Sequence, residues 1–233
     1  MYALIIAGGE GERLRPLTSD RPKAMIPVAG RPIIEHQLEW LHAGGVNDAV
    51  LLCGYRADVL KEYVGDGRRF GVNVQYTVEE EPLGRGGAMR EGYGLVPPGE
   101  RQVVACNGDI LTRQPLAEII RYHERKQAVA TVMLAPLRSP FGIVDVGRDG
   151  RINEFREKPE LPYWVNAGIY VLSPEFFERL PEKGDHETTT FPELAAEGKL
   201  FGFKSHAYWR PVDSIKDLSE AERELQQMAK ARA

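Results

Sequence analysis

A glycine-rich turn near the N-terminus carries the residue types that could perform chemistry. Gly8-Gly9-Glu10-Gly11-Glu12-Arg13 follows a short apolar run at residues 3–7, which predicts a buried strand. Backbone N–H groups in such a turn are free to bind an anion, and glycine removes the side chain that would block a phosphate. A second cation, Lys23, follows Arg13 a few residues downstream. We therefore expect this turn to hold a polyphosphate.

Two other phosphate-binding loops do not fit these residues. A Walker A loop ends in Gly-Lys-Ser/Thr, whereas Gly11 is followed by Glu12 and Arg13. A dinucleotide fingerprint that begins with Gly9 and Gly11 needs its third glycine where Leu14 stands. This mismatch disfavours a nicotinamide oxidoreductase. A plain surface turn is the remaining alternative, although a strand before the turn and two cations after it are unusual for one.

Two acidic residues stand where a metal ion would be useful. Asp109 lies in Asn107-Gly108-Asp109, directly after the apolar run 103–106. A carboxylate at the end of a parallel strand suits Mg²⁺, which takes few protein ligands and keeps waters and phosphates as the others. A simple turn capped by Asp109 is the alternative. Asp213 precedes the last predicted helix, where it could be an N-cap unless Ser214 performs that role.

The elements that position these residues alternate through the first half of the chain. Apolar runs predict strands at 2–7, 48–53, 73–77, 102–106 and 129–135. Helical patterns fall between them, at 32–43, 57–64, 87–93 and 116–127. Such alternation implies right-handed crossovers and a mainly parallel sheet. The glycine-rich turn and Asp109 then meet at one sheet edge, where ligands of such sheets bind.

The pattern changes after about residue 136. Short strands are predicted at 143–146, 152–155, 164–172 and 200–204. The Gly and Pro residues between them indicate turns and antiparallel pairing. Asp149-Gly150 suits a hairpin turn between the first two. Residues 214–231 predict a charged amphipathic helix. We expect an α/β fold with a Rossmann-like, mainly parallel sheet flanked by helices and a smaller antiparallel lobe. It forms one domain with parts at 1–135, 136–213 and 214–233.

Composition excludes several classes of protein. The chain has 233 residues and a formal net charge of −4, which argues against a nucleic-acid-binding protein. No segment approaches the ~18 apolar residues that span a membrane, and the chain enters a strand at once, without a signal peptide. The two cysteines, Cys53 and Cys106, end apolar runs and are predicted to be buried thiols. We therefore expect a cytoplasmic protein without nucleic-acid or membrane partners.

The string from Gly8 to Val28, G-G-x-G-x-R-L-x-P-L-T-x-x-x-P-K-x-x-x-P-V, resembles the sugar-1-phosphate nucleotidylyltransferases. The resemblance implies their nucleotide-diphospho-sugar transferase fold. It also implies Mg²⁺-dependent in-line transfer of a nucleotidyl group from an NTP to a sugar-1-phosphate, with release of pyrophosphate. Arg13 and Lys23 would be the catalytic cations, and Asp109 and Asp213 the Mg²⁺ ligands. The nucleotide-binding residues would be Ala7, Gly8, Gly9, Gly11, Glu12, Arg13, Glu81, Pro82, Leu83, Gly84, Gly87, Asn107 and Gly108.

Three segments of the second half resemble the sugar-phosphate side of the same family. Glu157-Lys158-Pro159 matches a family hallmark, in which Lys158 would meet the phosphate as a point charge and Glu157 the sugar hydroxyls. A charged strand end closed by proline is the alternative reading of this triplet. Asn166 and Gly168 match the family's sugar-contact segment. Gly142 matches a glycine whose backbone contacts the sugar.

The choice of substrates stays open at this stage. The segment from Glu81 to Ala88 resembles the family's L-G-T-A-G-A, but Arg85 replaces the Thr and Gly86 the first Ala. The first half is most similar to mannose-1-phosphate guanylyltransferases, so GTP and mannose-1-phosphate are expected first. Alternatives are a glucose-1-phosphate cytidylyl-, thymidylyl- or uridylyltransferase, a nucleotidyltransferase with a non-sugar phosphate acceptor, and a silent binding subunit. A homo-oligomer is compatible with the resemblance.

Overall fold

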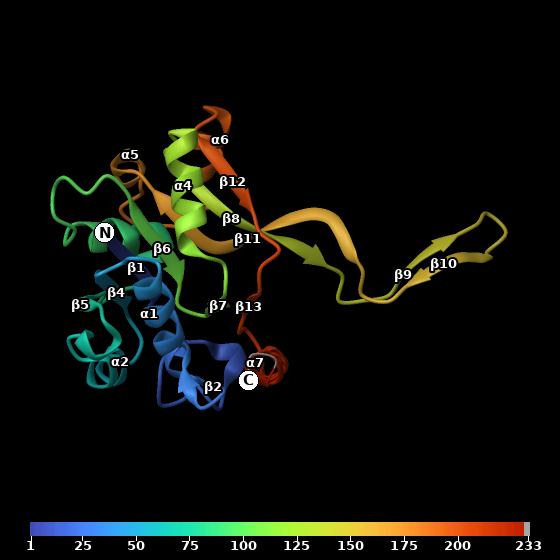
Figure 1. The fold of residues 1–233 in the computed structure, drawn as a ribbon, viewed down its shortest axis with the longest axis horizontal. Coiled ribbons are helices and arrows are strands. Elements are labelled where there is room, and N and C mark those ends of the chain that lie inside the picture. The colour runs from blue at the N-terminus through green and yellow to red at the C-terminus, as the bar shows by residue number, and fades with distance from the viewer. Residues whose placement is uncertain (231–233) are drawn as a thin grey trace.

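The computed structural model describes residues 1–230 and shows a central sheet with helices on both faces (Figure 1). Seven strands form this sheet in the order β12-β8-β11-β6-β1-β4-β5. The first-half strands next to one another are parallel: β1 (Tyr2–Ala7), β4 (Asp48–Cys53), β5 (Asn73–Val78) and β6 (Val103–Asn107). Each lies within one residue of its predicted range, so the predicted parallel sheet is confirmed.

The later strands extend the same sheet. β11 (Glu160–Leu172) lies between β6 and β8 (Ala130–Arg138) and is antiparallel to both. β12 (Leu200–Lys204) pairs parallel with β8 at the sheet edge. The antiparallel pairing predicted for residues 200–204 is therefore wrong. The helices between β11 and β12 carry the chain back, so that β12 enters in the direction of β8.

Helices and short strands complete the fold. The helix predicted at 87–93 begins earlier, at Gly84. The helix predicted at 214–231 runs to Lys230, the last described residue, and residue 231 lies outside the described part. The helices are α1 (Ile33–Ala43), α2 (Ala57–Val64), α3 (Gly84–Tyr93), α4 (Leu116–Lys126), α5 (Pro174–Glu178), α6 (Thr190–Ala196) and α7 (Ile215–Lys230). Three two-stranded antiparallel sheets pair β2 (Pro27–Val28) with β3 (Arg31–Pro32), β7 (Ile110–Thr112) with β13 (Trp209–Pro211), and β9 (Ile143–Val146) with β10 (Ile152–Arg156).

Both faces of the central strands are buried. Alternate residues of β1 enter different clusters: Ala3 and Ile5 face α1, α2 and α4, whereas Leu4 faces α3, α5 and α6. Side chains alternate across a strand, so a strand covered on both faces must be apolar throughout. This is why β1 reads as a continuous apolar run. The same burial fixes the strand ends from which the polar residues emerge.

A third apolar cluster ties the two ends of the chain together. It joins the segment after the glycine-rich turn, represented by Leu14 and Ile26, to Leu111 of β7 and Val212 beside β13. Ala221 adds the inner face of α7 and is fully buried. The cluster lies outside the main sheet. It places the N-terminal turn, the end of β6 and the start of α7 beside one another.

The β9–β10 hairpin projects far from the body of the molecule (Figure 1). We call residues 143–156 the arm. Its turn contains Gly150 with φ +81°, and the Gly147 N–H donates to the Arg151 carbonyl at 2.8 Å. The hairpin turn predicted at Asp149-Gly150 is therefore confirmed.

The predictions about the two cysteines and about membrane-spanning segments can be compared with the structure of residues 1–230. Cys53 and Cys106 are buried and free, as predicted, and burial raises the pKa of each thiol to about 12, which keeps both uncharged at neutral pH. Between residues 1 and 230, each helix is too short or too polar to cross a lipid bilayer. The cytoplasmic location and the exclusion of nucleic-acid partners remain predictions.

His186 is a fully buried titratable group in the loop between α5 and α6. Its ring packs edge-on against Tyr170, Phe176 and Phe191, and neither ring nitrogen has a hydrogen-bond partner. Burial, aided by the positive charge of Arg85, lowers the pKa of His186 to about 3. The unfolded chain therefore takes up this proton near pH 6.5, well before the folded protein does.

We predict that His186 contributes to acid destabilisation. Its folded-state pKa lies below the unfolded value, so its contribution is fully present above pH 6.5 and is lost as the pH falls toward 3. Replacing it with an uncharged ring, in His186→Phe, should reduce the loss of unfolding free energy between pH 7 and pH 5 by about 2 kcal/mol. Denaturant titrations at both pH values measure this. The matched control is His206→Gln, at an exposed position. Equal acid sensitivity of His186→Phe and wild type would contradict the assignment.

Candidate functional site

The glycine-rich turn has a fixed shape. Gly11 adopts φ +64°, and a Cβ there would lie 3.0 Å from the Thr18 side chain and 3.2 Å from Cβ of Lys23. The Thr18 hydroxyl and the Leu14 N–H both donate to the Gly11 carbonyl, each at 2.9 Å. Leu14 is fully buried in the third cluster and anchors the turn. A residue with a side chain would therefore disturb the turn at position 11.

Lys23 lies between the two aspartates that the sequence selected. Its Nζ atom is 2.5 Å from Oδ2 of Asp109 and 2.5 Å from Oδ1 of Asp213. Arg13 donates from Nη2 to the same Asp213 oxygen at 2.8 Å. The Lys23 side chain is 16% exposed, while that of Arg13 is 74% exposed. Two carboxylates and two cations therefore converge on one point, with Arg13 on the solvent side.

A short strand pair brings the two aspartates together. Pro211 in β13 pairs with Ile110 in β7, and the Val212 N–H donates to the Asp109 carbonyl at 2.9 Å. This register places Asp213 beside Asp109 although the two are far apart in the sequence. On the other side, the Gly108 N–H donates to the Ile6 carbonyl of β1 at 2.8 Å. The aspartates are thus attached to the backbone of the main sheet.

Ser214 caps the last helix and leaves the Asp213 carboxylate available. The Asp217 N–H donates to Oγ of Ser214 at 3.2 Å, and that hydroxyl donates back to the Asp217 carboxylate at 2.7 Å. Ser214 is thus the N-cap, and the Asp217 carboxylate also accepts from the Asp213 N–H at 3.3 Å. The N-cap role considered for Asp213 therefore belongs to Ser214. Asp109 likewise faces Lys23 instead of acting only in a turn.

A cavity of about 570 Å³ opens over this cluster. A second cavity of about 560 Å³ adjoins it, and Ile6, Gly9 and Arg85 line both. Both volumes lie within the usual range for small-molecule sites. The predicted site residues on the first cavity are Ala7, Gly9, Gly11, Glu12, Arg13, Lys23, Asn107, Gly108, Asp109 and Asp213. Gly8, Gly9, Pro82 and Gly84 line the second.

Three predicted nucleotide-binding residues line neither cavity. The Leu83 N–H donates to the Glu79 carboxylate at 2.9 Å, which shapes the loop before α3. Glu81 is exposed and pairs with Lys183 at 3.7 Å. Gly87 is buried under the loop between α5 and α6. All three are close in sequence to Pro82, Gly84 and Arg85, which do line the second cavity.

Arg85 belongs to the site but was not selected from the sequence. Its backbone N–H and Nε donate to Oδ1 of Asp185 at 2.9 and 3.2 Å, and Nη1 lies 2.8 Å from the Glu187 carboxylate. These contacts hold a cation at the junction of the two cavities. The sequence signal for Arg85 is its departure from the family pattern, which places a cation within a glycine-rich turn. Such a cation could have been interpreted as a ligand contact.

The glycines beside Arg85 permit a close approach of the neighbouring loop. The N–H groups of Gly86 and Gly87 donate to the Gly184 carbonyl at 2.8 and 3.2 Å. A Cβ at Gly86 would lie 2.8 Å from that oxygen, and one at Gly87 would lie 2.6 Å from the Glu182 carbonyl. Backbone atoms cannot move aside cheaply, so residue 86 must be glycine in this packing. This accounts physically for the departure from the family's alanine.

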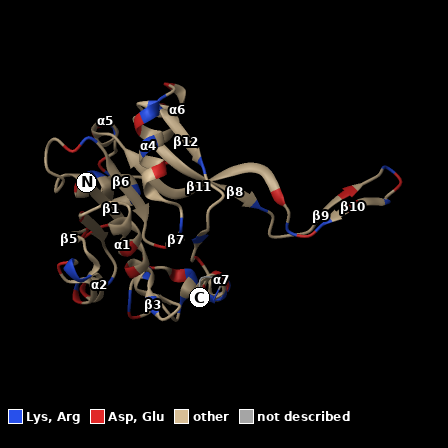
Figure 2. Ribbon diagram, in the orientation of Figure 1, with Lys and Arg blue, Asp and Glu red and all other residues tan. Residues whose placement is uncertain are grey.

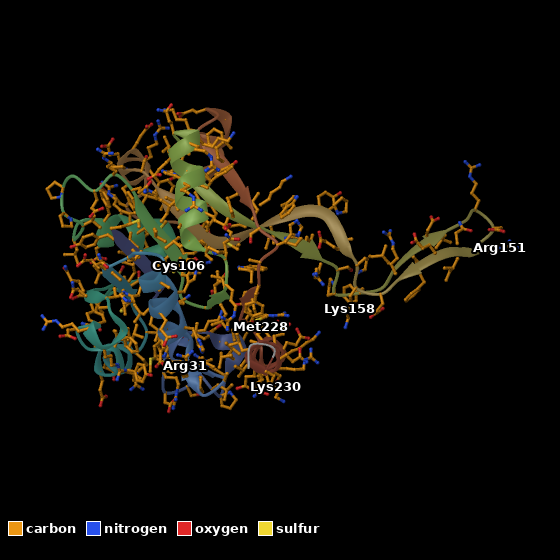
Figure 3. All side chains as sticks on the ribbon, viewed as in Figure 1. Arg31, Cys106, Arg151, Lys158, Met228 and Lys230 are labelled. Atoms are coloured by element: carbon orange, nitrogen blue, oxygen red, sulfur yellow. The ribbon has the colours of Figure 1, made fainter. Side chains whose placement is uncertain are left out.

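The predicted sugar-phosphate residues fall into two groups. Gly142, Glu157 and Lys158 flank the arm, and Figure 3 shows Lys158 at the base of the arm. None of these three lines either cavity. Gly168 lies close to the site, because a Cβ there would be 2.6 Å from the Asn107 amide nitrogen. Oδ1 of Asn166 accepts from the Gly168 N–H at 2.8 Å and supports this bend.

The residues present fit a magnesium ion. Asp109 and Asp213 offer carboxylate oxygens, and these already converge on one positive charge, the Lys23 ammonium group. Within residues 1–230, no group of three or more His, Cys, Asp or Glu side chains is arranged to hold a metal. Mg²⁺ needs only one or two carboxylates when substrate phosphates and waters complete its shell, unlike a structural metal.

Comparison with solved structures identifies the fold. HddC from Yersinia pseudotuberculosis superposes with a TM-score of 0.77 at 24% sequence identity, covering 96% of this chain and 99% of that one. A UDP-glucose pyrophosphorylase complexed with UDP-glucose gives a TM-score of 0.75 at 19% identity, with 97% and 98% coverage. The α/β fold is therefore shared with these solved nucleotidyltransferase structures, as the sequence predicted.

Sequence comparison identifies the family. The model of the family described as "Nucleotidyl transferase" matches residues 2–228, so the chain belongs to this family. The mannose-1-phosphate guanylyltransferase of Mycobacterium tuberculosis is 34% identical over 231 residues, covering 96% of this chain and 64% of that protein. The mannose-1-phosphate guanyltransferase of Yarrowia lipolytica is 36% identical over 228 residues, with 93% and 62% coverage. The chain thus spans less than two thirds of the length of these relatives.

We predict that Gly86→Ala destabilises the protein although it lies in a helix. Alanine gains about 1 kcal/mol over glycine in a helix interior, but the contact with the Gly184 carbonyl costs about 1–3 kcal/mol. The net effect should be a loss of unfolding free energy of up to about 2 kcal/mol, measured by denaturant titration. Gly9→Ala is the matched control, because a Cβ there meets nothing within 4 Å. A Gly86→Ala protein as stable as wild type would disprove the close packing.

Proposed function

We propose that this protein transfers a nucleotidyl group from an NTP to a sugar-1-phosphate and releases pyrophosphate. The observation that carries the proposal is the position of Lys23 between Asp109 and Asp213 beneath the glycine-rich turn. The family match and the names of the relatives support it. Because those relatives are named mannose-1-phosphate guanylyltransferases, we propose GTP and mannose-1-phosphate as the first substrates to test.

The proposed reaction asks little covalent chemistry of the protein. An oxygen of the sugar phosphate forms a bond to the α-phosphorus of the NTP. The bond between the α-phosphorus and the pyrophosphate oxygen, which lies in line with the attacking oxygen, breaks, and pyrophosphate leaves with its electron pair. Positioning and charge neutralisation supply most of the catalysis in such transfers. The two cations at the cavity, Arg13 and Lys23, would bind the triphosphate and stabilise the charge that moves onto pyrophosphate.

Asp109 and Asp213 would hold Mg²⁺ in this proposal. A bound Mg²⁺ would neutralise phosphate charge and orient the reacting groups. Lys23, which neutralises both carboxylates in the structure, would then direct its charge to the phosphates instead. Arg13 contacts Asp213 at a largely exposed position and is accessible to an incoming triphosphate.

The sugar-1-phosphate is assigned to the side of the site that β11 approaches. Gly168 and Asn166 would contact the sugar near the end of β6. Lys158 and Glu157 remain our proposed phosphate and hydroxyl contacts, together with the backbone of Gly142. Because these three flank the arm, they would act only if the arm's base closes toward the nucleotide. The second cavity, lined by Pro82, Gly84 and Arg85, would take the base and ribose.

We predict pyrophosphate release when the wild-type protein is given GTP, mannose-1-phosphate and Mg²⁺. Lys23→Ala should reduce this turnover by ~10²–10³, the usual loss when one charge-stabilising donor is removed. A coupled pyrophosphate assay measures both. The control is Lys216→Ala, which removes a side chain that is 69% exposed and away from the cavity.

The same assay separates the alternatives when run over a grid of NTPs and phosphorylated acceptors. Turnover only with another base or sugar would replace the proposed substrates but keep the reaction. Turnover only with an acceptor other than a sugar phosphate would replace the acceptor class. No pyrophosphate release with any pair, or near-normal turnover in a folded Lys23→Ala protein, would contradict the proposed function.

We predict that Asp109→Asn uncouples nucleotide binding from Mg²⁺. Wild-type affinity for GTP should rise when Mg²⁺ is added, whereas the variant should bind GTP with an affinity that Mg²⁺ changes little, because a neutral amide is a poorer ligand for this hard cation. Isothermal titration calorimetry with and without Mg²⁺ measures the difference. Asp145→Asn on the arm is the matched control. An unchanged Mg²⁺ effect in Asp109→Asn would show that Asp109 is not a ligand.

A further inference from the structure

Arg85 is the charged side chain that the two cavities share. Ile6, Gly9 and Arg85 line both cavities, and of these three residues Ile6 is apolar and Gly9 has no side chain. A nucleotide that extends from one cavity into the other passes these three residues. The part of the nucleotide that lies at this junction therefore meets the Arg85 guanidinium group.

The charges of the two cavities indicate how a nucleotide lies across them. Three cations, Arg13, Lys23 and Arg85, match the three carboxylates that line the first cavity. In the second cavity Arg85 stands against four carboxylates, those of Glu10, Glu79, Glu80 and Asp185. Such a surplus of carboxylates repels a triphosphate, whereas the N–H groups of a base can donate to them. The phosphates therefore belong in the first cavity, and the α-phosphate, which is joined to the ribose, belongs at the junction.

The protein as a whole does not attract a polyanion. The formal net charge of the chain is −4, and Figure 2 shows Lys and Arg interspersed with Asp and Glu over the body of the molecule. A triphosphate must therefore be held by individual cations close to its phosphates. The orientation of each cation at the cavities then decides which phosphate oxygen it binds.

The Arg85 guanidinium group is held at two of its three nitrogen atoms. Nε donates to Oδ1 of Asp185 at 3.2 Å, and Nη1 lies 2.8 Å from the Glu187 carboxylate. Within residues 1–230, Nη2 has no hydrogen-bond partner, and the Arg85 side chain is 45% exposed. Because the guanidinium group is planar and rigid, the two contacts fix its orientation and leave the two N–H groups of Nη2 available.

The loop that holds Arg85 also occupies the backbone donors at the start of α3. Oδ1 of Asp185 accepts from the Arg85 backbone N–H at 2.9 Å, and the Gly184 carbonyl accepts from the N–H groups of Gly86 and Gly87. Hydrogen bonds from the Arg85 side chain and backbone lower the pKa of Asp185, which keeps this carboxylate charged. An anion at the junction must therefore bind to the Arg85 side chain instead of the helix N-terminus.

We propose that Arg85 is a further catalytic residue, whose Nη2 atom donates to a non-bridging oxygen of the α-phosphate. This inference rests on the proposed function. The attacking sugar phosphate brings negative charge to the α-phosphorus, and donors that are already oriented stabilise this charge in the transition state. Arg13 and Lys23 bind the phosphates that leave as pyrophosphate, while Asp185 and Glu187 hold the Arg85 guanidinium group in place.

Phosphorothioate analogues test this contact, because sulfur in place of one α-oxygen weakens its hydrogen bond. The wild type, with Mg²⁺ and mannose-1-phosphate, should turn over the Rp and Sp diastereomers of GTPαS at different rates. Arg85→Thr introduces the residue of the family pattern and should reduce GTP turnover by ~10². It should also change the ratio of the two diastereomers' rates at least about tenfold, because only one of them has sulfur at the Arg85 contact. If another NTP supports turnover, its α-thio diastereomers take the place of GTPαS.

Arg90→Thr controls for the loss of an arginine from α3. Nη1 of Arg90 donates to the Leu180 carbonyl at 3.1 Å, so this change also removes a contact between α3 and the segment after α5. Arg90 lines neither cavity. The control should therefore keep both the GTP turnover and the diastereomer ratio of the wild type.

The diastereomer ratio separates a phosphate contact from a structural role. A disturbed fold slows both diastereomers alike, so a ratio in Arg85→Thr equal to that of wild type would overturn the contact even if turnover falls. Wild type that releases no pyrophosphate from any substrate pair would instead contradict the proposed function. Isothermal titration calorimetry with the two GTPαS diastereomers then tests Arg85 by itself. Their affinity ratio should change in Arg85→Thr, and an unchanged ratio, or no binding of either diastereomer, would overturn the contact.

Discussion

The organisation of the site depends on the ammonium group of Lys23. Asp109 and Asp213 are only 25% and 33% exposed, and two carboxylates held so close together repel each other. The Lys23 charge, 2.5 Å from each, offsets that repulsion and the cost of desolvation. The same arrangement places a cation and two carboxylates, which are hard anionic ligands, at one point. It is therefore a structural link between the two ends of the chain, and in our proposal it also binds a polyanion and its metal.

The rest of the fold holds Lys23, Asp109 and Asp213 in contact with one another. The parallel strands β1 and β6 bring the glycine-rich turn and Asp109 to one sheet edge. The β7–β13 pair and the third apolar cluster bring in Asp213 from the other end of the chain. Arg85, held by Asp185 and Glu187, lies where the first cavity meets the second. A charged site that requires three separate chain segments can form only in the folded protein.

Sequence reasoning predicted what depends on local pattern. The apolar runs predicted the parallel strands, and the glycines with Arg13 and Lys23 predicted the turn that lines the first cavity, because strand burial and backbone freedom depend on residue types in the local sequence. It missed the parallel pairing of β12, which depends on how α5 and α6 return the chain. It also missed Arg85, whose importance arises from the Gly184 loop packed on Gly86. The strands of the arm were predicted correctly, but their projection from the body was not, because it depends on tertiary contacts.

A crystal structure with Mg²⁺ and a non-hydrolysable GTP analogue tests the central claim most directly. The account predicts that the triphosphate lies in the 570 Å³ cavity along the turn at Gly9 and Gly11. Lys23 should contact a phosphate oxygen, and Asp109 and Asp213 should coordinate the metal. A triphosphate bound elsewhere, with Lys23 still held between the two carboxylates, would contradict it.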